Sequence, residues 1–369
     1  MKLSPPDPRA ALAAAKLLLS LPTAPYHEHR VRTELRRFLS AAGIRSRTDA
    51  YGNLIARYRR GKAAPIAFAA HMDHPGFEII SCRGESAAAR WNGQVPPFDM
   101  RGLELALWSA DGRRRRGCAR VLDGDGRRPR ARAARLCLRV PAETRAGDFG
   151  YADVTPFRLS GNRIVGKSLD NGGGCAAIAA TLAHLASRRL PGDVTALFTR
   201  AEEVGFLGAA GAISGASVPP TRPLIVLECS REMPGAVQGA GPVIRVGDRL
   251  RVFDPDLILA CEETARALAK RRSSFCYQRR LMDGGACESS LFSLSGYRTA
   301  CLAFPLRNYH NIGRRGLAAE CIDRRDFING VDCLAAFSAL GVHPAPERRR
   351  TAAAIRRRIG SPDRLKESA

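Results

Sequence analysis

The chain contains no run of 18 or more apolar residues, the length an α-helix needs to cross a bilayer, so we expect no membrane partner. The apolar stretch Ala10–Leu21 has the length of a signal-peptide core. However, Lys16 interrupts this stretch, and Pro5, Asp7 and Pro8 stand where a basic leader would lie. No small-residue cleavage site follows it cleanly. We therefore interpret Ala10–Leu21 as an amphipathic helix of the mature protein.

Paired cysteine spacings are also missing. The 369 residues include 11 cysteines, an odd number, and no two of them have C-x-x-C spacing. A disulfide framework is typical of short secreted chains with an even count, and a zinc ribbon needs paired spacings. The sequence therefore predicts reduced, mostly buried thiols and a cytoplasmic location.

Lysine is scarce, because only six of the 59 basic residues are lysine and the rest are arginine. The formal net charge of +24 invites a nucleic-acid hypothesis. Aromatic residues make up only 6% of the chain, and none is interleaved with the arginine clusters as a base-stacking platform would require. The clusters are Arg113–Arg116, Arg127–Arg135, Arg348–Arg350 and Arg356–Arg358. We therefore expect a solvated basic surface and no specific nucleic-acid partner.

The pattern of apolar residues predicts an α/β fold with an insertion. Helical spacing in Glu28–Ala42 and Gly174–Ser187 alternates with apolar runs such as Pro65–Ala70, which suit strands buried on both faces. Between residues 75 and 160 the sequence lacks this alternation and instead has short strand-like segments, Asp153–Phe157 among them, and many Gly and Asp turns. We predict a discontinuous main domain (1–74 and 161–343), an inserted β-rich domain (75–160) and a basic tail (344–369).

Five short motifs with histidine or carboxylate side chains follow predicted strands, where open α/β sheets place their sites. Each has a plain alternative: a surface histidine, a phosphate-binding glycine loop, an exposed acidic pair or a helix cap. The glycine run after Asp170 lacks the Lys-Ser/Thr of a P-loop. The motifs are His71-Met72-Asp73, Ser168-Leu169-Asp170 with Asn171–Gly174, Thr199–Gly205 with Glu202 and Glu203, Leu227-Glu228-Cys229, and Pro305–Asn311 with His310.

Together the motifs supply a complete set of metal ligands. Zinc takes imidazole and carboxylate ligands, and two metals roughly 3.5–4 Å apart form a clamp for hydrolysis that aminopeptidases use. Two adjacent carboxylates after a buried strand, as at Glu202 and Glu203, are costly unless a cation or a proton balances them. The conjunction of the motifs indicates a two-metal hydrolase.

The order and spacing of these motifs resemble the clan MH metallopeptidases, and within them the tetrahedral (glutamyl-type) zinc aminopeptidase family. Members of that family carry Gly-Asn-Leu-Ile-Ala and then Ala-His-Met-Asp with Gly-Phe shortly after, as this chain does at Gly52–Ala56 and Ala70–Phe77. The Asp turn, the Glu-Glu-Val-Gly run, Asp283–Ala286 and Pro-x-Arg-x-x-His ending at His310 follow in order. The resemblance covers roughly residues 15–340.

The resemblance implies an activity, a fold and a role for each motif residue. The activity is that of a metallo-aminopeptidase of the EC 3.4.11 type, which removes N-terminal residues from peptides by a water activated between two metals. The fold is a mixed-sheet zinc-peptidase domain with helices on both faces, carrying a small β-rich dimerisation domain. Asp170 would bridge the two metals, with His71 and Glu228 completing one metal site and Glu203 and His310 completing the other. Glu202 would be the general base, and Asp73 would orient His71.

The resemblance also implies partners, cofactors and one backbone feature. We expect two divalent ions, zinc in the first place with cobalt or manganese as alternatives, and peptide substrates. Family members assemble from dimers, often into dodecamers that enclose a cavity. We also expect a cis peptide bond between Asp170 and Asn171.

Three residues depart from the family pattern, and two other functions stay open. Glu228 stands where the family usually has Asp, His74 replaces the usual Glu, and Asn171 follows the bridging Asp where Asp is common. Sister families use Glu at the position of Glu228, which favours a carboxypeptidase or an N-acyl-amino-acid deacylase. The insertion directly after His-x-Asp argues against both of these activities. A non-catalytic binding protein that kept the fold is the third reading, and the complete ligand set argues against it.

Overall fold

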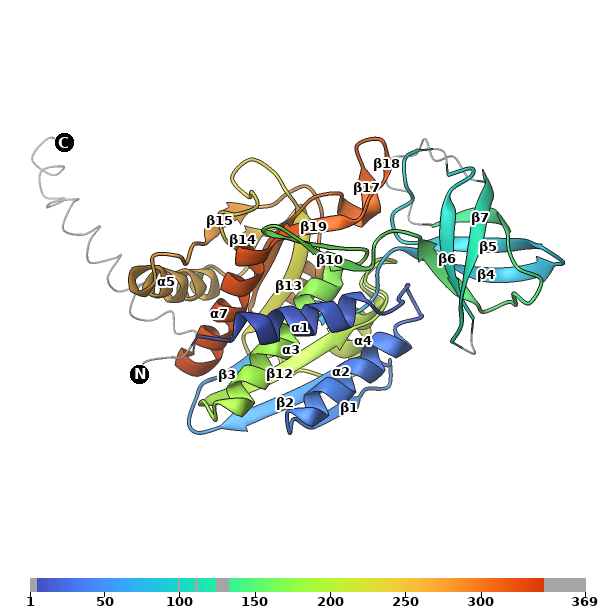
Figure 1. Cartoon of the computed structure of the whole chain (residues 1–369). Coiled ribbons are helices and arrows are strands. Elements are labelled where there is room, and N and C mark those ends of the chain that lie inside the picture. Colours follow the sequence, from blue (N-terminus) through green and yellow to red (C-terminus); the bar gives the residue numbers. More distant parts are fainter. Residues whose placement is uncertain (1–4, 99, 110–111, 124–132, 342–369) are drawn as a thin grey trace, which may run out of the picture.

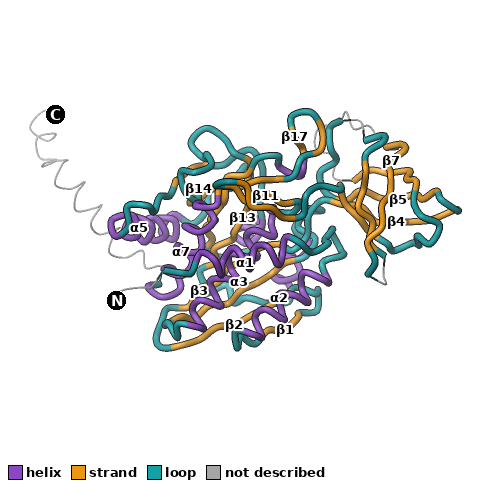
Figure 2. Tube along the Cα trace, in the orientation of Figure 1, coloured by secondary structure: helices purple, strands orange, loops and turns teal. Residues whose placement is uncertain are grey.

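The computed structural model describes residues 5–98, 100–109, 112–123 and 133–341. A mixed eight-stranded sheet forms the centre of the main domain (Figures 1 and 2). Its strands, in sheet order, are β1 (Ser46–Thr48), β2 (Leu54–Arg60), β12 (Gly192–Thr199), β3 (Pro65–His71), β13 (Leu224–Arg231), β16 (Thr299–Leu306), β14 (Val243–Gly247) and β15 (Gln278–Leu281). The central strands β12, β3, β13 and β16 run parallel, which brings their carboxyl ends to one edge of the sheet.

Helices cover both faces of this sheet. One face carries α1 (Pro8–Leu19), α2 (His29–Ala41), α3 (Leu169–Ser187), α5 (Pro255–Arg271) and α7 (Arg324–Leu340). The other face carries α4 (Leu207–Ser214) and α6 (Glu288–Leu294). The predicted fold class is confirmed: a mixed-sheet α/β domain with helices on both faces and a small inserted β-rich domain.

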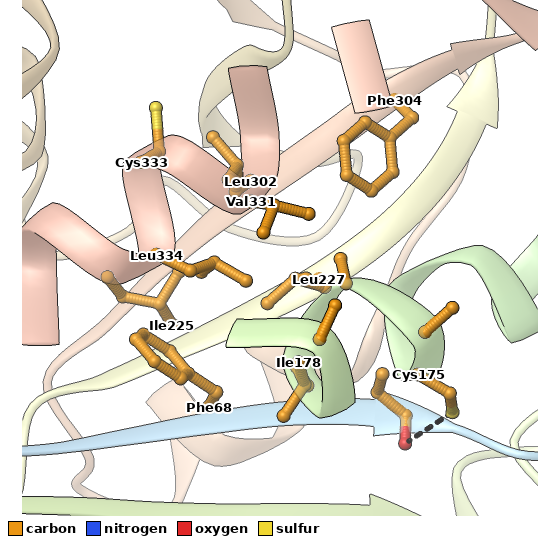
Figure 3. Packing of buried hydrophobic residues seen from close by; sticks show 14 of the residues in the cluster. Phe68, Cys175, Ile178, Ile225, Leu227, Leu302, Phe304, Val331, Cys333 and Leu334 are labelled. Carbon is orange, nitrogen blue, oxygen red and sulfur yellow. Dashed lines mark hydrogen bonds between the residues drawn. The ribbon is translucent and has the colours of Figure 1, made fainter. Parts of the chain in front are cut away.

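Strand β3 shows why its sequence is an unbroken apolar run. Side chains alternate across a strand, so Phe68 lies in the large core with α3 and α7, whereas Ala67 and Ala69 lie in the core on the other face. In the large core, Ile178 of α3 and Leu334 of α7 pack near Phe68 (Figure 3). Both faces of the strand therefore need apolar side chains.

The inserted segment closes into a six-stranded barrel that projects from one end of the main domain (Figure 1). In barrel order its strands are β4 (Gly76–Arg83), β5 (Ser86–Asn92), β8 (Ala133–Arg139), β7 (Arg114–Asp123), β6 (Glu104–Trp108) and β9 (Phe149–Ala152). It has a hydrophobic core of its own, which includes Phe77, Trp91 and Leu107. The β-type piece predicted at Asp153–Phe157 is wrong, because the chain leaves β9 at Ala152 and has no strand again until β10.

Smaller elements complete the described part of the chain. They are β10 (Phe157–Ser160), β11 (Arg163–Gly166) and β19 (Glu320–Asp323), which form a three-stranded sheet, the pair β17 (Ile312–Gly313) and β18 (Gly316–Leu317), and the 3₁₀ turn η1 (Tyr309–Asn311). The stretch suspected as a signal peptide is helix α1, which buries Ala11, Ala15 and Leu19 against the core. None of the helices in the described ranges combines the length and hydropathy that crossing a bilayer requires. The predicted basic tail (344–369) lies outside the described residues.

Candidate metal centre and active site

Two buried histidines meet at the carboxylate of Asp170. His71 Nε2 lies 3.4 Å from Asp170 Oδ1, and His310 Nε2 lies 3.4 Å from Asp170 Oδ2. His71 Nε2 is also 3.8 Å from Glu228 Oε2, and His310 Nε2 is 2.9 Å from Glu203 Oε1. The structure thus brings together all five residues predicted as metal ligands, although 239 positions separate the first from the last.

These side chains form two groups of three that share one member. Ligand atoms of His71, Asp170 and Glu228 lie within 4.8 Å of one another, as do those of Asp170, Glu203 and His310. The shared Asp170 presents one oxygen to each histidine, which is the arrangement a bridging carboxylate needs. A third group joins His71 to Glu202 and Glu203, so the acidic pair faces the same space.

The backbone places each side chain differently. His71 is the last residue of β3, as the sequence predicts. Glu228 lies inside β13, which continues to Arg231, so its predicted position at the strand end is wrong. The strand continues because residues 228–231 keep pairing with β16 as far as Leu306. The peptide bond after Asp170 is cis, as expected from the resemblance.

The glycine run after Asp170 serves close packing. A Cβ atom on Gly172 would meet Leu19 Cδ2 at 2.9 Å, and one on Gly174 would lie 2.2 Å from Asn171 Oδ1. The Asn171 amide accepts a hydrogen bond from Gly174 N and donates one to Leu227 O at the neighbouring strand. These glycines let the start of α3 approach β13 and α1, so the phosphate-cradle alternative has no support in the packing.

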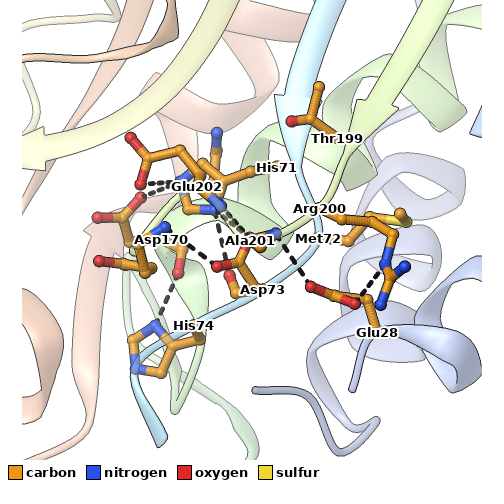
Figure 4. A network of polar contacts seen from close by, with 12 residues as sticks. Glu28, His71, Met72, Asp73, His74, Asp170, Thr199, Arg200, Ala201 and Glu202 are labelled. Atoms are coloured by element: carbon orange, nitrogen blue, oxygen red, sulfur yellow. Dashed lines mark hydrogen bonds and ion pairs between the residues drawn. The ribbon is translucent and has the colours of Figure 1, made fainter. Parts of the chain in front are cut away.

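The acidic pair sits on a turn whose backbone is held by side chains from other elements (Figure 4). Four successive amides each donate to a buried side chain, and Ala201, in the middle, has a left-handed φ of 50°. The four bonds join Arg200 N to Asn53 Oδ1 (3.1 Å), Ala201 N to Glu28 Oε1 (3.0 Å), Glu202 N to Asp73 Oδ1 (3.0 Å) and Glu203 N to Asp73 Oδ2 (3.1 Å). This network restrains both carboxylates of the pair.

Asp73 contacts both the histidine and the acidic turn. Its Oδ1 lies 3.5 Å from His71 Nδ1, and the same ring nitrogen is 3.2 Å from the Asp73 carbonyl oxygen. The predicted role of orienting His71 is therefore compatible with the geometry. Both Asp73 oxygens also accept the amides of Glu202 and Glu203, which no sequence motif indicates.

Burial and mutual charge shift the pKa values of the whole cluster. Burial would lower the pKa of His310, but the carboxylates of Glu203 and Asp170 raise it on balance to about 10. Burial would also lower the pKa of His71, but the nearby carboxylates of Glu202, Asp170, Asp73 and Glu228 raise it well above 6.5. Burial, followed by the charges of Glu203 and Glu228, raises the pKa of Glu202 well above 4.5, against the effect of His71.

The donor set fits a divalent metal. In the described part of the chain, Asp170 Oδ1 and Glu228 Oε1 are buried without a hydrogen-bond partner, while Glu203 Oε1 and His310 Nε2 contact each other at 2.9 Å. Such atoms are costly to bury unless a cation or a proton satisfies them. Imidazole nitrogens and carboxylate oxygens are ligands of zinc, and they also suit cobalt and manganese. The residues present therefore match the group that the resemblance implies.

Sequence reasoning assigned no role to several residues that contact the centre, two of which are Gln94 and His74. Gln94, from the barrel segment, places its Oε1 3.1 Å from His310 Nδ1, where it can accept the ring proton. His74 contacts the Asp170 carbonyl oxygen (2.7 Å) and Asn311 Oδ1 (3.0 Å), and burial lowers its pKa to about 4, so it is neutral. The only sequence signal was the departure at His74; nothing marked Gln94.

A pocket of about 350 Å³ opens beside the centre. The candidate ligands and Glu202 line one side of it. The rest of the wall carries both apolar and basic side chains, among them Phe206, Met233, Met282, Arg231, Arg245 and Arg249. The space is large enough for an amino-acid side chain and part of a peptide next to the candidate metal ligands.

The fold and site define a class of metal-dependent peptidases, and comparison with known proteins agrees. The family model described as M42 glutamyl aminopeptidase matches residues 141–331. A protein of Acetivibrio thermocellus, provisionally named an aminopeptidase, is 25% identical over 302 residues, which cover 72% of this chain and 81% of the relative.

Two solved structures share the fold. The aminopeptidase APDkam598 of Desulfurococcus kamchatkensis superposes with a TM-score of 0.73 at 22% identity, covering 91% of this chain and 96% of the other. The TET1 peptidase of Pyrococcus horikoshii, which can assemble into a tetrahedron or a large octahedral shell, also reaches 0.73 at 22% identity, covering 89% of this chain and 99% of the other. This chain belongs to the M42 glutamyl aminopeptidase family; it is a hydrolase of the peptidase class.

Proposed function

We propose that this protein is an aminopeptidase that holds two divalent metal ions and removes N-terminal residues from peptides. The observation that carries the proposal is the shared carboxylate of Asp170, with one oxygen facing each histidine. His71, Asp170 and Glu228 would hold one ion, and Asp170, Glu203 and His310 the other. When bound, such ions lower the pKa of water from about 15.7 toward about 7 and polarise a carbonyl group.

Glu202 is the general base of this proposal. Its carboxylate is buried, lines the pocket and lies 3.9 Å from His71 Nε2, farther from a histidine than Glu203 is. A raised pKa suits a carboxylate that takes a proton from water and returns it to a leaving amine. Glu202 therefore moves the proton, while Asp73 holds Glu202 and Glu203 by their backbone amides.

The comparisons favour a substrate with a free amine, because the matching family model and relatives are described as aminopeptidases. A site that recognises the charged amine of the substrate would restrict cleavage to N-terminal residues. An acetylated amine loses this charge. The proposal therefore predicts cleavage of free N-termini and not of blocked ones.

The test combines metal analysis with two substrates. The purified protein is analysed for bound metal and then assayed on a peptide with a free N-terminus and on its N-acetylated twin, before and after chelation. We expect hydrolysis of the free peptide only, loss of activity with the chelator, and recovery on adding Zn²⁺, Co²⁺ or Mn²⁺. A metal-loaded protein that cleaves neither peptide would instead support the binding-protein reading.

A second candidate activity, a carboxypeptidase or N-acyl-amino-acid deacylase, is favoured by the basic wall of the pocket. Arg231 and Arg249 line it, and both activities require recognition of a substrate α-carboxylate. Arg245 is a weaker candidate, because its guanidinium already donates to the carbonyl oxygens of Met282 and Gly285. Preferential hydrolysis of N-acetyl amino acids, or release of C-terminal residues, would identify this activity.

Metal binding should release protons at neutral pH. The pKa of His310 is about 10 without metal, so its imidazole is charged at pH 7, whereas a metal ligand must be neutral. Metal affinity should therefore rise with pH from 7 toward about 10. Isothermal titration with Zn²⁺ in buffers of different ionisation enthalpy measures the protons released. His310→Ala should release fewer, and a heat that does not depend on the buffer would contradict the prediction.

We also propose that the inserted domain, predicted at residues 75–160, mediates self-association through a dimer building block, with a dodecamer as the larger assembly. The barrel has its own core and projects away from the main domain (Figure 1), and the related TET1 peptidase assembles into large shells. The location we propose is the cytoplasm, since all 11 cysteines are unpaired thiols.

Removing the barrel should give a monomer. Phe77 at its start pairs with Gly150 near its end, so a short Gly-Ser linker can replace Gly76–Ala152 without moving the flanking chain. Light scattering after size exclusion should show the mass of one shortened chain. Circular dichroism checks that the main domain stays folded, and an assembly of unchanged subunit number would show that association lies elsewhere.

A further inference from the structure

A fully buried carboxylate outside the predicted ligand set connects two of the candidate ligands. Glu320, the first residue of β19, has no exposed surface. Its Oε2 accepts the backbone N–H of Asp170 (3.0 Å), and its Oε1 accepts the backbone N–H of His310 (2.8 Å). Asp170 and His310 are 140 positions apart and belong to the same group of three. Glu320 therefore joins the backbones of two ligands that must stay close.

The backbone around His310 needs such support. His310 has a left-handed φ of 56°, as do Asn311 directly after it (60°) and Asn308 two residues before it (56°). Residues with side chains rarely adopt this conformation, and it persists only where the surroundings restrain it. Asn308 Nδ2 donates to Ala319 O, and Asn311 Nδ2 donates to Lys167 O. The bond to Glu320 restrains the residue between them, whose imidazole faces Asp170 and Glu203.

The surroundings of Glu320 include a buried lysine. Lys167 is buried, with its Nζ 3.3 Å from Ser168 Oγ and 4.5 Å from the centre of the Tyr151 ring. The charge of Glu320 raises the pKa of Lys167, but burial outweighs it and lowers that pKa to about 7, while burial and the charge of Asp170 raise the pKa of Glu320 well above 4.5. A buried charge is tolerated where an opposite charge and hydrogen bonds compensate it. The two amide donors and Lys167 therefore compensate part of the cost of burying the Glu320 carboxyl group.

Asp73 offers an internal parallel on the other side of the centre. Each oxygen of Asp73 accepts the amide of one residue of the acidic pair, just as each oxygen of Glu320 accepts the amide of one ligand. Two buried carboxylates thus hold four backbone positions of the site. In both cases the bond restrains the backbone and leaves the ligand's side chain available to a metal.

We propose that Glu320 is a positioning residue that sets the metal affinity of the Asp170–Glu203–His310 group by holding Asp170 and His310 through their backbone amides. The inference depends on the proposed function, because it assumes that this group binds a metal. It concerns affinity and not the chemical step. Residues that orient ligands from outside typically change metal affinity by about 10–100-fold when they are replaced.

The test is Glu320→Gln, measured by titration of the metal-free protein with Zn²⁺ and with Co²⁺, whose absorption bands report coordination. Glutamine keeps the shape of the side chain, but its Nε2 is a donor and cannot accept the second amide. The binding step that disappears in His310→Ala should weaken by about 10–100-fold in Glu320→Gln. Glu320→Asp, which keeps the carboxyl group but is shorter, should fall between glutamine and the wild type.

Asp326→Asn is the matched control. Asp326 is also a buried carboxylate that accepts two backbone amides, those of Gly239 and Gly241 (2.8 Å each), and neither belongs to a candidate ligand. The Asp326→Asn substitution should lower the melting temperature of the metal-free protein and leave the Zn²⁺ isotherm unchanged. If Glu320→Gln does not fold, the metal affinities of Glu320→Asp and Asp326→Asn are compared instead, and only Glu320→Asp should bind metal more weakly than the wild type.

The outcomes separate the two proposals. A wild-type protein that binds neither Zn²⁺ nor Co²⁺ would contradict the proposed function itself. If the wild type binds metal and both Glu320→Gln and Glu320→Asp give the same isotherm as the wild type, only the inference about Glu320 is overturned. Equal weakening in Glu320→Gln and Asp326→Asn would also overturn it, because the effect would then come from general loss of stability.

Discussion

Replacing Glu202 with glutamine should lower kcat by about 10²–10⁴-fold while leaving the bound metal in place. Glutamine keeps the size of the side chain but cannot take up a proton in the way the carboxylate does. The nearest histidine nitrogen to Glu202 is 3.9 Å away, whereas Glu203 lies 2.9 Å from His310 within a complete group of three. The loss should therefore appear in proton transfer and not in coordination. Steady-state kinetics and metal analysis of the same preparation measure both.

The adjacent residue provides the control for this prediction. Glu203→Gln removes one charge from the same turn, but it replaces a charged ligand with a neutral one in the Asp170–Glu203–His310 group. Its metal content should fall together with its activity. If Glu202→Gln keeps full activity, or loses metal as Glu203→Gln does, then the roles assigned to the pair are wrong. Both variants keep the backbone amides that Asp73 accepts, so the turn itself should be preserved.

The fold was predictable where local pattern determines structure. The apolar run of β3 and the helical spacing of α3 follow from burial on both faces of one sheet. Strand order was not predictable, because β12 lies between β2 and β3 although more than 120 residues separate it from β3. Strand β15 was also missed, since its sequence Gln278–Leu281 is polar and lies at the edge of the sheet, where burial imposes no pattern.

The residues of the site were also predictable only in part. His71, Asp170 and His310 stand in motifs that chemistry marks, so the sequence identified them. Glu320 and Glu28 carry no such mark, because an acidic residue in a polar loop is indistinguishable from a solvated one until the chain folds around it. One partner of each lies far along the chain: Asp170 is 150 positions from Glu320, and Ala201 is 173 from Glu28. The sequence therefore identified the residues of the proposed ligand set, but not the side chains that hold them in place.

Asp73→Asn should lower both metal affinity and the catalytic rate. Each Asp73 oxygen accepts one backbone amide of the acidic pair, and Oδ1 also lies 3.5 Å from His71 Nδ1. Asparagine retains one acceptor oxygen, and its Nδ2 would face an N–H donor with which it cannot bond. At least one member of the pair must then shift, and leaving a buried amide unsatisfied costs about 1–3 kcal/mol.

We expect metal affinity to fall by about 10–100-fold in Asp73→Asn, because His71 loses an orienting carboxylate and Glu203 loses its backbone anchor. The rate at saturating metal should fall as well, because Glu202 depends on the same anchor; this distinguishes Asp73→Asn from Glu202→Gln, which should bind metal normally. Zn²⁺ titration followed by kinetics at full occupancy separates the two effects. Normal metal affinity with an intact rate would mean that Asp73 is dispensable, and that the bonds from Glu28 and Asn53 to the turn suffice to hold the acidic pair.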